Sequence, residues 1–480
     1  MFKKGGVYSL GSILQQLISF VMIPLYTTYL GTEDYGILSL MTITAALVLT
    51  ITKSTAANGF VRYYYAPGYE SKRKKLFFNS VVFSLSLSLI ISILFFLSAK
   101  SMSVLILGDS NYLEVVYIFS VIILLQPLVN LVQDLLIMQK RAGKFILMHV
   151  LNTVISTGLI LFLILEHDMK YMALIWGAFA LNVFPVLFLF SDILKNMEFK
   201  IDKNIQKEIL SYGYPLTLTA LSLFVIEYSD HYLIKYLLDV EKVGLYSFGF
   251  KFAFVINIIL VIPVHNIINP LIFELEKDKD NLLIFIRKIF TYFIFIASAF
   301  GLMLSLFSRE IIKLLAQKPE FWPSWQVVPA LAFAYVFFGM MEISGKGLLL
   351  TKRTKIYGSL FGLIACLNII MSYIFINITG IQGAAISKLI SFIIINFFLI
   401  ILSVRYYGIT INIKKISNVL FFALGILIIS HEFIIQDLLL SLLFKLMLFF
   451  VFIISILLSG VFSKDEIDYL RSKLKLLQKK

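Results

Sequence analysis

The chain has 480 residues, of which 60% are hydrophobic and 15% are charged, and its formal net charge is +14. Soluble globular chains carry roughly 25% charged residues, so this composition excludes a soluble protein and predicts an integral membrane protein. The single cysteine, Cys366, excludes an intramolecular disulfide and a multi-cysteine metal site.

Apolar windows long enough to cross a bilayer recur along the whole chain. The fourteen predicted spans are 7–30, 36–60, 76–99, 112–137, 145–165, 170–190, 209–238, 242–271, 282–307, 325–350, 355–377, 380–404, 413–430 and 438–462. The first window is too long for a signal peptide and lacks its cleavage site, so we interpret it as a spanning helix. The sequence therefore predicts an all-α polytopic membrane protein with about 14 transmembrane helices.

Basic residues gather in alternate loops. If the N-terminus is cytoplasmic, the basic clusters at 72–75, 140–144, 195–207 and 352–355 all lie in cytoplasmic loops. This asymmetry follows the positive-inside rule, so we expect both termini in the cytoplasm. Orientation and attraction to anionic headgroups explain the net charge, and we expect membrane lipids but no nucleic acid as partners. The basic tail 463–480 fits either an amphipathic helix on the inner leaflet or a solvated terminus.

An internal repeat indicates how the spans are organised. The pattern E-x-x-G-[IL]-x-S occurs at 33–39 and again 208 residues later at 241–247. A second match, Lys140-Arg141 with Lys352-Arg353, has nearly the same offset. Because the offset spans six predicted helices, both copies cross the membrane in the same direction, which predicts two parallel repeats related by an axis along the membrane normal.

The repeat defines the predicted domains. We expect two six-helix lobes joined by a polar cytoplasmic linker, then two additional helices and a basic cytoplasmic tail. Their boundaries are 1–190, 191–208, 209–404, 405–462 and 463–480.

Charged residues inside the predicted spans are candidates for function. An ionised group near the bilayer centre costs about 2.5–3.5 kcal/mol on insertion scales, so several of these residues are expected to line a protein-enclosed polar path. The ten candidates are Lys53, Asp134, Glu227, Asp230, Lys235, Lys251, Glu342, Lys346, Lys388 and Lys445.

The seventh predicted helix carries Glu227, Asp230 and His231 on one face. Two carboxylates and an imidazole can hold a proton or a cation, which makes them candidates for ion coupling. The alternative is an internal charge pair with a lysine of the eighth or twelfth helix.

Three lysines, Lys53, Lys251 and Lys388, lie deep within apolar spans, and Arg62 closes the second helix. Ammonium and guanidinium groups suit phosphate oxygens, so we assign these four residues to a cationic substrate-binding cavity. For Arg62 the alternative is an interfacial anchor beside its aromatic neighbours.

The other five charges have structural explanations. Glu342 and Lys346 are spaced for an intrahelical ion pair, while Asp134, Lys235 and Lys445 lie toward helix ends, where their side chains can extend to the interface.

Soluble catalytic motifs are absent from the sequence. It contains no G-x-x-x-x-G-K-[ST] for nucleotide phosphates, no H-E-x-x-H and no G-x-S-x-G. We therefore expect no enzyme activity, no cofactor and no metal site.

Three segments carry a family resemblance. They are the opening GVYSLGSILQQLISFVMIPLYTTYLGTEDYGILSL, the segment GFVRYYY at 59–65, and Gly380-Ile381-Gln382-Gly383-Ala384-Ala385. The chain resembles the bacterial polysaccharide flippases of the O-antigen and capsule repeat-unit type, within the multidrug/oligosaccharidyl-lipid/polysaccharide exporter superfamily. By motif, the resemblance supports Arg62 best among the site residues.

The resemblance implies a transporter of the bacterial inner membrane that moves an undecaprenyl-diphosphate-linked oligosaccharide between leaflets by alternating access of two lobes. It also implies a link to lipopolysaccharide or capsule synthesis and, as a further partner, a glycan polymerase complex. Three alternatives stay open: a multidrug/cation antiporter of the same superfamily, a lipid II flippase, and a membrane glycan polymerase or acyltransferase.

Overall fold

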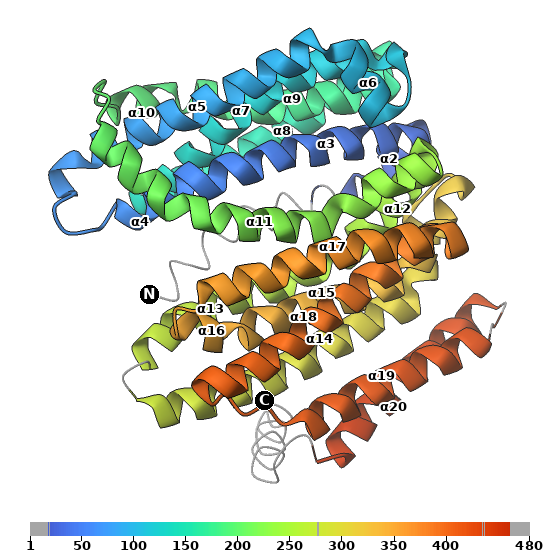
Figure 1. Cartoon of the computed structure of the whole chain (residues 1–480). Coiled ribbons are helices and arrows are strands. Elements are labelled where there is room, and N and C mark those ends of the chain that lie inside the picture. The colour runs from blue at the N-terminus through green and yellow to red at the C-terminus, as the bar shows by residue number, and fades with distance from the viewer. Residues whose placement is uncertain (1–17, 19, 276–277, 434, 436, 461–480) are drawn as a thin grey trace, which may run out of the picture. The chain divides into compact units, whose positions relative to one another are not determined.

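A computed structural model describes residues 18, 20–275, 278–433, 435 and 437–460. Every regular element in these residues is a helix, as expected for a chain that must satisfy its backbone hydrogen bonds within lipid. The all-α prediction is thereby confirmed (Figure 1).

The first half of the described chain contains α2 to α11. Their bounds are α2 Ile23–Tyr29, α3 Thr32–Thr52, α4 Asn58–Tyr63, α5 Arg73–Leu97, α6 Ala99–Leu107, α7 Leu113–Met138, α8 Ala142–His167, α9 Lys170–Phe188, α10 Phe190–Lys195 and α11 Lys203–Leu237. A π-helical segment, Lys53–Ala57, joins α3 to α4.

The second half contains α12 to α20. Their bounds are α12 Val240–Ala253, α13 Ile262–Leu275, α14 Lys279–Leu315, α15 Val328–Ser344, α16 Lys346–Leu350, α17 Thr354–Thr379, α18 Ile381–Tyr407, α19 Ile413–Glu432 and α20 Leu438–Leu458. A second π-helical segment, Asn257–Val261, precedes α13, and a 3-10 helix, Pro319–Val327, precedes α15.

Within the described residues, 12 helices are long and apolar enough to cross a membrane, and α11, bent by 42° near Tyr214, raises the number to 13. They coincide with the predicted windows from 36–60 onward, so the chain is a multi-pass membrane protein. The first predicted window, 7–30, falls mostly outside the described residues, which include only α2 from it. The tail 463–480 also lies outside them.

The chain divides into two compact units. The first comprises Met1–Gly249, Ile312–Ser324 and Lys355–Ser391, and the second comprises Phe250–Ile311, Trp325–Thr354 and Phe392–Lys480. The repeat-based domain boundaries stay a prediction.

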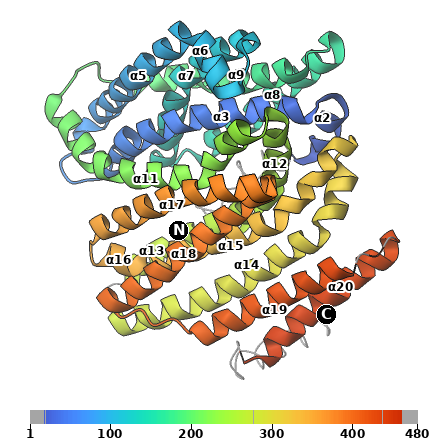
Figure 2. The same ribbon diagram turned by 45° about the vertical axis from the view of Figure 1, so that its right-hand side comes forward.

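In the first unit, α5 packs along α7 and α8 packs along α9, as both ribbon views show (Figures 1 and 2). A column of serines spaced by four residues on α5, including Ser88 and Ser92, lets the backbones approach. Ser92 donates to the carbonyl of Ser120 on α7 at 2.7 Å. Small hydroxyl side chains thus replace bulky apolar packing between these two helices.

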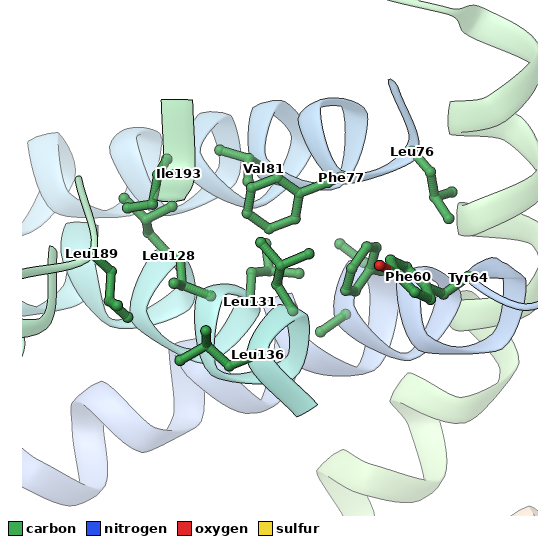
Figure 3. Close-up of a cluster of buried hydrophobic side chains, with 14 of the residues drawn as sticks. Phe60, Tyr64, Leu76, Phe77, Val81, Leu128, Leu131, Leu136, Leu189 and Ile193 are labelled. Carbon is green, nitrogen blue, oxygen red and sulfur yellow. The ribbon is translucent and has the colours of Figure 1, made fainter. Parts of the chain in front are cut away.

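The core of the first unit lies where α4, α5 and α7 meet. Figure 3 shows Phe60 of α4 beside Leu131 of α7, with Tyr64, the residue that follows α4, next to Phe60 and below Leu76 of α5. The ring of Phe60 contacts both Tyr64 and Phe77, with centroid distances of 5.4 and 5.6 Å. This cluster holds α4, and with it the segment that carries Arg62, against the helix bundle.

A polar contact at the end of α9 ties two segments together. Asp192 on α10 accepts hydrogen bonds from Lys144 and, at 2.5 Å, from Arg141. Burial opposes ionisation of the Asp192 carboxyl, but the hydrogen bonds from Lys144 and Arg141 and their charges outweigh this and hold its pKa below the usual value.

We expect Asp192→Asn to lower the free energy of unfolding by on the order of 1 kcal/mol at pH 7. A lowered pKa stabilises the folded state above about pH 4, and this contribution disappears as the pH falls through the folded-state pKa. Thermal unfolding of the purified variant from pH 7 downward measures this. Asp168→Asn, at an exposed position, is the control, and an Asp192→Asn effect that persists unchanged in acid would contradict the assignment.

Candidate substrate and ion sites

A buried ion pair lies at the centre of the predicted charged set. Lys388 of α18 places its Nζ 2.8 Å from Oδ2 of Asp230 on α11, and it donates to the carbonyl of Glu227 at 2.6 Å. Asp230 and Lys388 are each only 1% exposed. The sequence analysis gave an internal charge pair with a lysine of the eighth or twelfth predicted helix as the alternative to ion coupling. The observed contact is such a pair, formed with Lys388 of the twelfth predicted helix.

Two further side chains complete the cluster around Asp230. Tyr246 of α12 donates its hydroxyl to Asp230 Oδ2 at 2.5 Å, and Nδ1 of His231 lies 2.8 Å from Oδ1. The His231 and Tyr246 rings meet edge to face, with centroids 5.0 Å apart. Both carboxylate oxygens are thus engaged, which allows an ionised Asp230 to remain in an apolar bundle.

A chain of neutral polar groups surrounds the cluster on α17 and α18. Asn368 donates to the hydroxyl of Ser391 at 2.9 Å and accepts from Ser229 at 3.3 Å. The hydroxyls of Ser372 and Ser387 lie 2.6 Å apart. These hydrogen bonds connect α11, which carries Asp230, to α17 and α18.

Lys53 occupies a different environment. It begins the π-helical segment after α3, and its side chain is exposed although it lies within a predicted span. Its ammonium acts electrostatically on the Asp134 carboxylate of α7. π-Helical turns within α-helices occur frequently at functional sites, because the shifted backbone ladder redirects side chains. Asp134, which the sequence predicts to extend toward the interface, lies on α7, the helix that packs against this π-helical segment.

Arg62 lies in the last turn of α4 and is exposed. Its guanidinium makes no hydrogen bond or ion pair with any residue that the structure describes. An exposed arginine at this position can bind a phosphate or anchor the helix at the interface, so both predicted alternatives stay open.

Lys251 lies half-buried on α12, beyond Tyr246, and belongs to the second compact unit. The structure therefore brings Glu227, Asp230, His231 and Lys388 together and places Lys53 near Asp134. That Lys251 and Arg62 line one common cavity remains a prediction.

The charges with structural explanations have specific partners. Lys346 lies 3.9 Å from Glu342, as their spacing predicts, and Glu342 also contacts His265 at 2.7 Å. Lys235 donates to the carbonyl of Leu105 at the end of α6, at 3.0 Å. A cation at the carbonyl end of a helix is stabilised by the helix dipole.

A crossing of α3 and α12 brings the two copies of the sequence repeat into contact. The hydroxyls of Ser39 and Ser247 lie 2.7 Å apart, and these positions are 208 residues apart, the offset of the repeat. A Cβ on Gly36 would lie 2.1 Å from the carbonyl oxygen of Val240, and one on Gly244 would lie 1.7 Å from that of Thr32. Only glycine permits this approach.

Sequence reasoning missed Tyr246 and this crossing. The repeated motif contains a signal for the crossing, because Gly244 and Ser247 are two of its fixed positions, whereas Tyr246 occupies a variable one. The motif predicts a duplication, but the sequence alone does not indicate that its two copies are in contact. No group of three or more histidine, cysteine, aspartate or glutamate residues suited to a metal ion occurs in the described part of the chain.

Comparison with known proteins identifies the family. Residues 1–276 match the family model described as polysaccharide biosynthesis protein. Lsg locus putative protein 1 of Haemophilus influenzae is 24% identical over 288 residues, covering 58% of this chain and 67% of the relative.

Solved structures with a similar fold are transporters. A lipid II flippase MurJ in an inward closed conformation matches with a TM-score of 0.72 and 17% identity, covering 93% of this chain and 97% of that one. An inward-facing multidrug resistance MATE family transporter of the MOP superfamily matches with a TM-score of 0.65 and 16% identity, covering 82% and 94%. At these identities the likeness shows the fold alone.

The predicted fold class and family resemblance are both confirmed. Because the family model spans more than half of its residues, the chain belongs to the polysaccharide biosynthesis protein family.

Proposed function

We propose that the protein is a flippase that moves a polyprenyl-diphosphate-linked oligosaccharide repeat unit across the bacterial inner membrane. The observation that carries the proposal is the match of residues 1–276 to the polysaccharide biosynthesis family, together with a fold shared with flippases and transporters. In this proposal the protein is a carrier and not an enzyme, both termini are cytoplasmic, and a glycan polymerase complex receives its product.

The charge of the candidate site favours an anionic cargo. Lys53 and Arg62 are exposed cations on consecutive segments of one helical stretch, Thr32–Tyr63. A diphosphate carries several acceptor oxygens that ammonium and guanidinium groups bind through charge-assisted hydrogen bonds. In this proposal Lys53 and Arg62 receive the diphosphate from the inner leaflet, and Lys251 is the third candidate contact.

Ion coupling is the second part of the proposal. Glu227, Asp230 and His231 are its candidates, and Lys388 occupies the position at Asp230 that a coupling cation would take. A proton or metal cation that displaces the Lys388 ammonium would free it to move, and α18 would move with it. The two predicted lobes would then alternate in access according to whether a proton or metal cation is bound at Asp230.

We expect Lys53→Ala to reduce surface glycan by roughly 10–100-fold, because the loss of a charged hydrogen bond costs about 1.5–3 kcal/mol. Arg62→Ala is expected to act in the same direction, and Lys53→Arg is expected to retain activity. The measurement is complementation of a strain that lacks its repeat-unit flippase, at matched protein levels.

Lys195→Ala, an exposed lysine outside the spans, is the control. Normal glycan from both Lys53→Ala and Arg62→Ala would contradict the phosphate-binding role. Drug resistance without glycan loss would favour the antiporter alternative, and rescue of peptidoglycan synthesis would favour lipid II as the cargo.

A further inference from the structure

Three tyrosines from separate segments of the first unit meet beside the end of α4. Tyr63 is the last residue of α4, Tyr69 lies in the loop that follows it, and Tyr212 belongs to α11. The ring centroid of Tyr63 lies 5.4 Å from that of Tyr69 and 6.4 Å from that of Tyr212. None of the three side chains is fully buried, and Tyr212 is 39% exposed. We call these three residues the tyrosine platform.

Close packing of α11 positions the platform. α11 packs against α4 and against the π-helical segment that precedes it (Figure 1). A Cβ on Gly213 of α11 would lie 2.1 Å from the carbonyl oxygen of Thr55 in that segment, so only glycine permits this approach. The residue before this glycine is Tyr212, and the same approach brings its ring to Tyr63.

The loop after α4 is held in place by its own contacts. Nε of Arg73 donates to the carbonyl of Tyr64 at 3.0 Å, and the guanidinium lies over the Tyr64 ring, 4.9 Å from its centroid. The Tyr69 hydroxyl donates to Oε2 of Glu208 on α11. A platform that is already ordered loses little conformational entropy when it binds a ligand.

Polar groups on the platform are available to a ligand. The hydroxyls of Tyr63 and Tyr212 make no hydrogen bond with any residue that the structure describes. Glu208 is exposed, and within the same residues only its Oε2 accepts a hydrogen bond. A tyrosine hydroxyl both donates and accepts, whereas an ionised carboxylate only accepts. The platform therefore combines aromatic rings with free donors and acceptors.

This combination favours a sugar over a lipid headgroup. One face of a sugar ring consists largely of C–H groups that pack on an aromatic ring, and its hydroxyls both donate and accept. A phosphate on the platform would bring no donor to the Glu208 carboxylate, and the two like charges would repel each other. The platform itself thus suits a neutral ring with many hydroxyls.

Cations border the platform. Arg62 directly precedes Tyr63 and is exposed, and the Lys72 ammonium lies 6.0 Å from the centroid of the Tyr69 ring. Guanidinium and ammonium groups bind phosphate oxygens through charge-assisted hydrogen bonds. The matching ligand therefore carries an anionic phosphate next to its sugar ring.

We propose that the tyrosine platform and Glu208 bind the sugar that adjoins the diphosphate of the cargo. The proposal rests on the proposed function, in which Arg62 binds the diphosphate. Because Arg62 and Tyr63 are consecutive, a sugar bonded to a phosphate at Arg62 packs its C–H face on the platform. Its hydroxyls bind those of Tyr63 and Tyr212 and the free oxygen of Glu208. Recognition of the cargo then depends on its first sugar.

Short synthetic lipids isolate the contribution of the sugar. Three probes carry glucose, galactose or N-acetylglucosamine on the terminal phosphate of farnesyl diphosphate. The reference is the methyl ester of farnesyl diphosphate, which has the same charge but no sugar. We expect the purified full-length protein to bind at least one sugar-bearing probe about tenfold more tightly than the reference, as measured by isothermal titration calorimetry. Equal affinity for all four would overturn the proposal.

Variants separate the sugar from the phosphate. Tyr63→Ala and Tyr212→Ala are expected to abolish the preference and to leave the affinity for the reference unchanged, since they remove a ring and a hydroxyl but no charge. Tyr63→Phe keeps the ring and is expected to retain part of the preference. Arg62→Ala is expected to weaken all four probes equally. Tyr236→Ala, at an exposed tyrosine of the same helix α11, is the matched control.

Two results with the alanine variants would overturn the proposal. One is a preference that persists in both, and the other is an equal weakening of the sugar-bearing probes and the reference, which would indicate that the tyrosines only maintain the fold. Both results leave the proposed flippase activity intact, because complementation by the wild-type protein tests that activity separately.

Discussion

Lys388→Met is expected to lower the free energy of unfolding by about 3–5 kcal/mol, because it leaves the Asp230 carboxylate buried without its cation. Tyr246 and His231 still bind the carboxylate, but neither supplies the fixed charge of the ammonium. The measurement is thermal unfolding of the purified protein in a defined detergent or nanodisc.

A second substitution distinguishes structure from coupling. Asp230→Asn combined with Lys388→Met removes both charges and is expected to recover most of the stability. If the pair also couples transport to an ion, the double variant stays inactive although it is folded. Lys195→Met, at an exposed lysine outside the spans, is the control for stability. A Lys388→Met protein as stable as the wild type would contradict the buried-pair assignment.

The second large effect is expected at the crossing of α3 and α12. Cysteines at positions 39 and 247 should form a disulfide, because the serine oxygens they replace are 2.7 Å apart. If the proposed alternating access separates these helices, which belong to different predicted lobes, oxidation is expected to reduce transport to background and reduction to restore it. The readout is surface glycan or cargo movement in vesicles, in a Cys366→Ser background.

Each single-cysteine variant controls for the substitution alone. Gly244→Ala adds a methyl group that collides with the Thr32 carbonyl, so it should reduce the yield of the cross-link. Full transport by a completely cross-linked protein would show that the crossing does not open during the cycle.

Hydropathy was sufficient to predict the spanning helices that the structure describes. Predicted windows such as 145–165 and 413–430 agree closely with α8 and α19, because the need to satisfy backbone groups in lipid leaves the helix as the favoured solution. The π-helical segments at 53–57 and 257–261 were not predicted. They shift hydrogen bonds without a change in hydrophobicity, so a window average does not detect them.

Pairing of charges was harder to predict than their presence. Glu227, Asp230 and His231 share a face because of their spacing, but which lysine reaches Asp230 depends on the rotation of α18 and on its neighbours. Glu310, the partner of Lys445, was not singled out, since it lies beyond the predicted window 282–307 near the end of α14. Partners that are distant in sequence require the tertiary structure.

The contact between Ser39 and Ser247 has an evolutionary consequence. Gly36 meets Val240 while Gly244 meets Thr32, and each of these residues corresponds to one in the other repeat. Such reciprocity is the signature of an isologous interface between identical subunits. If the predicted repeat arose by duplication and fusion of one gene, its single-repeat ancestor is expected to have assembled as a parallel homodimer through this motif.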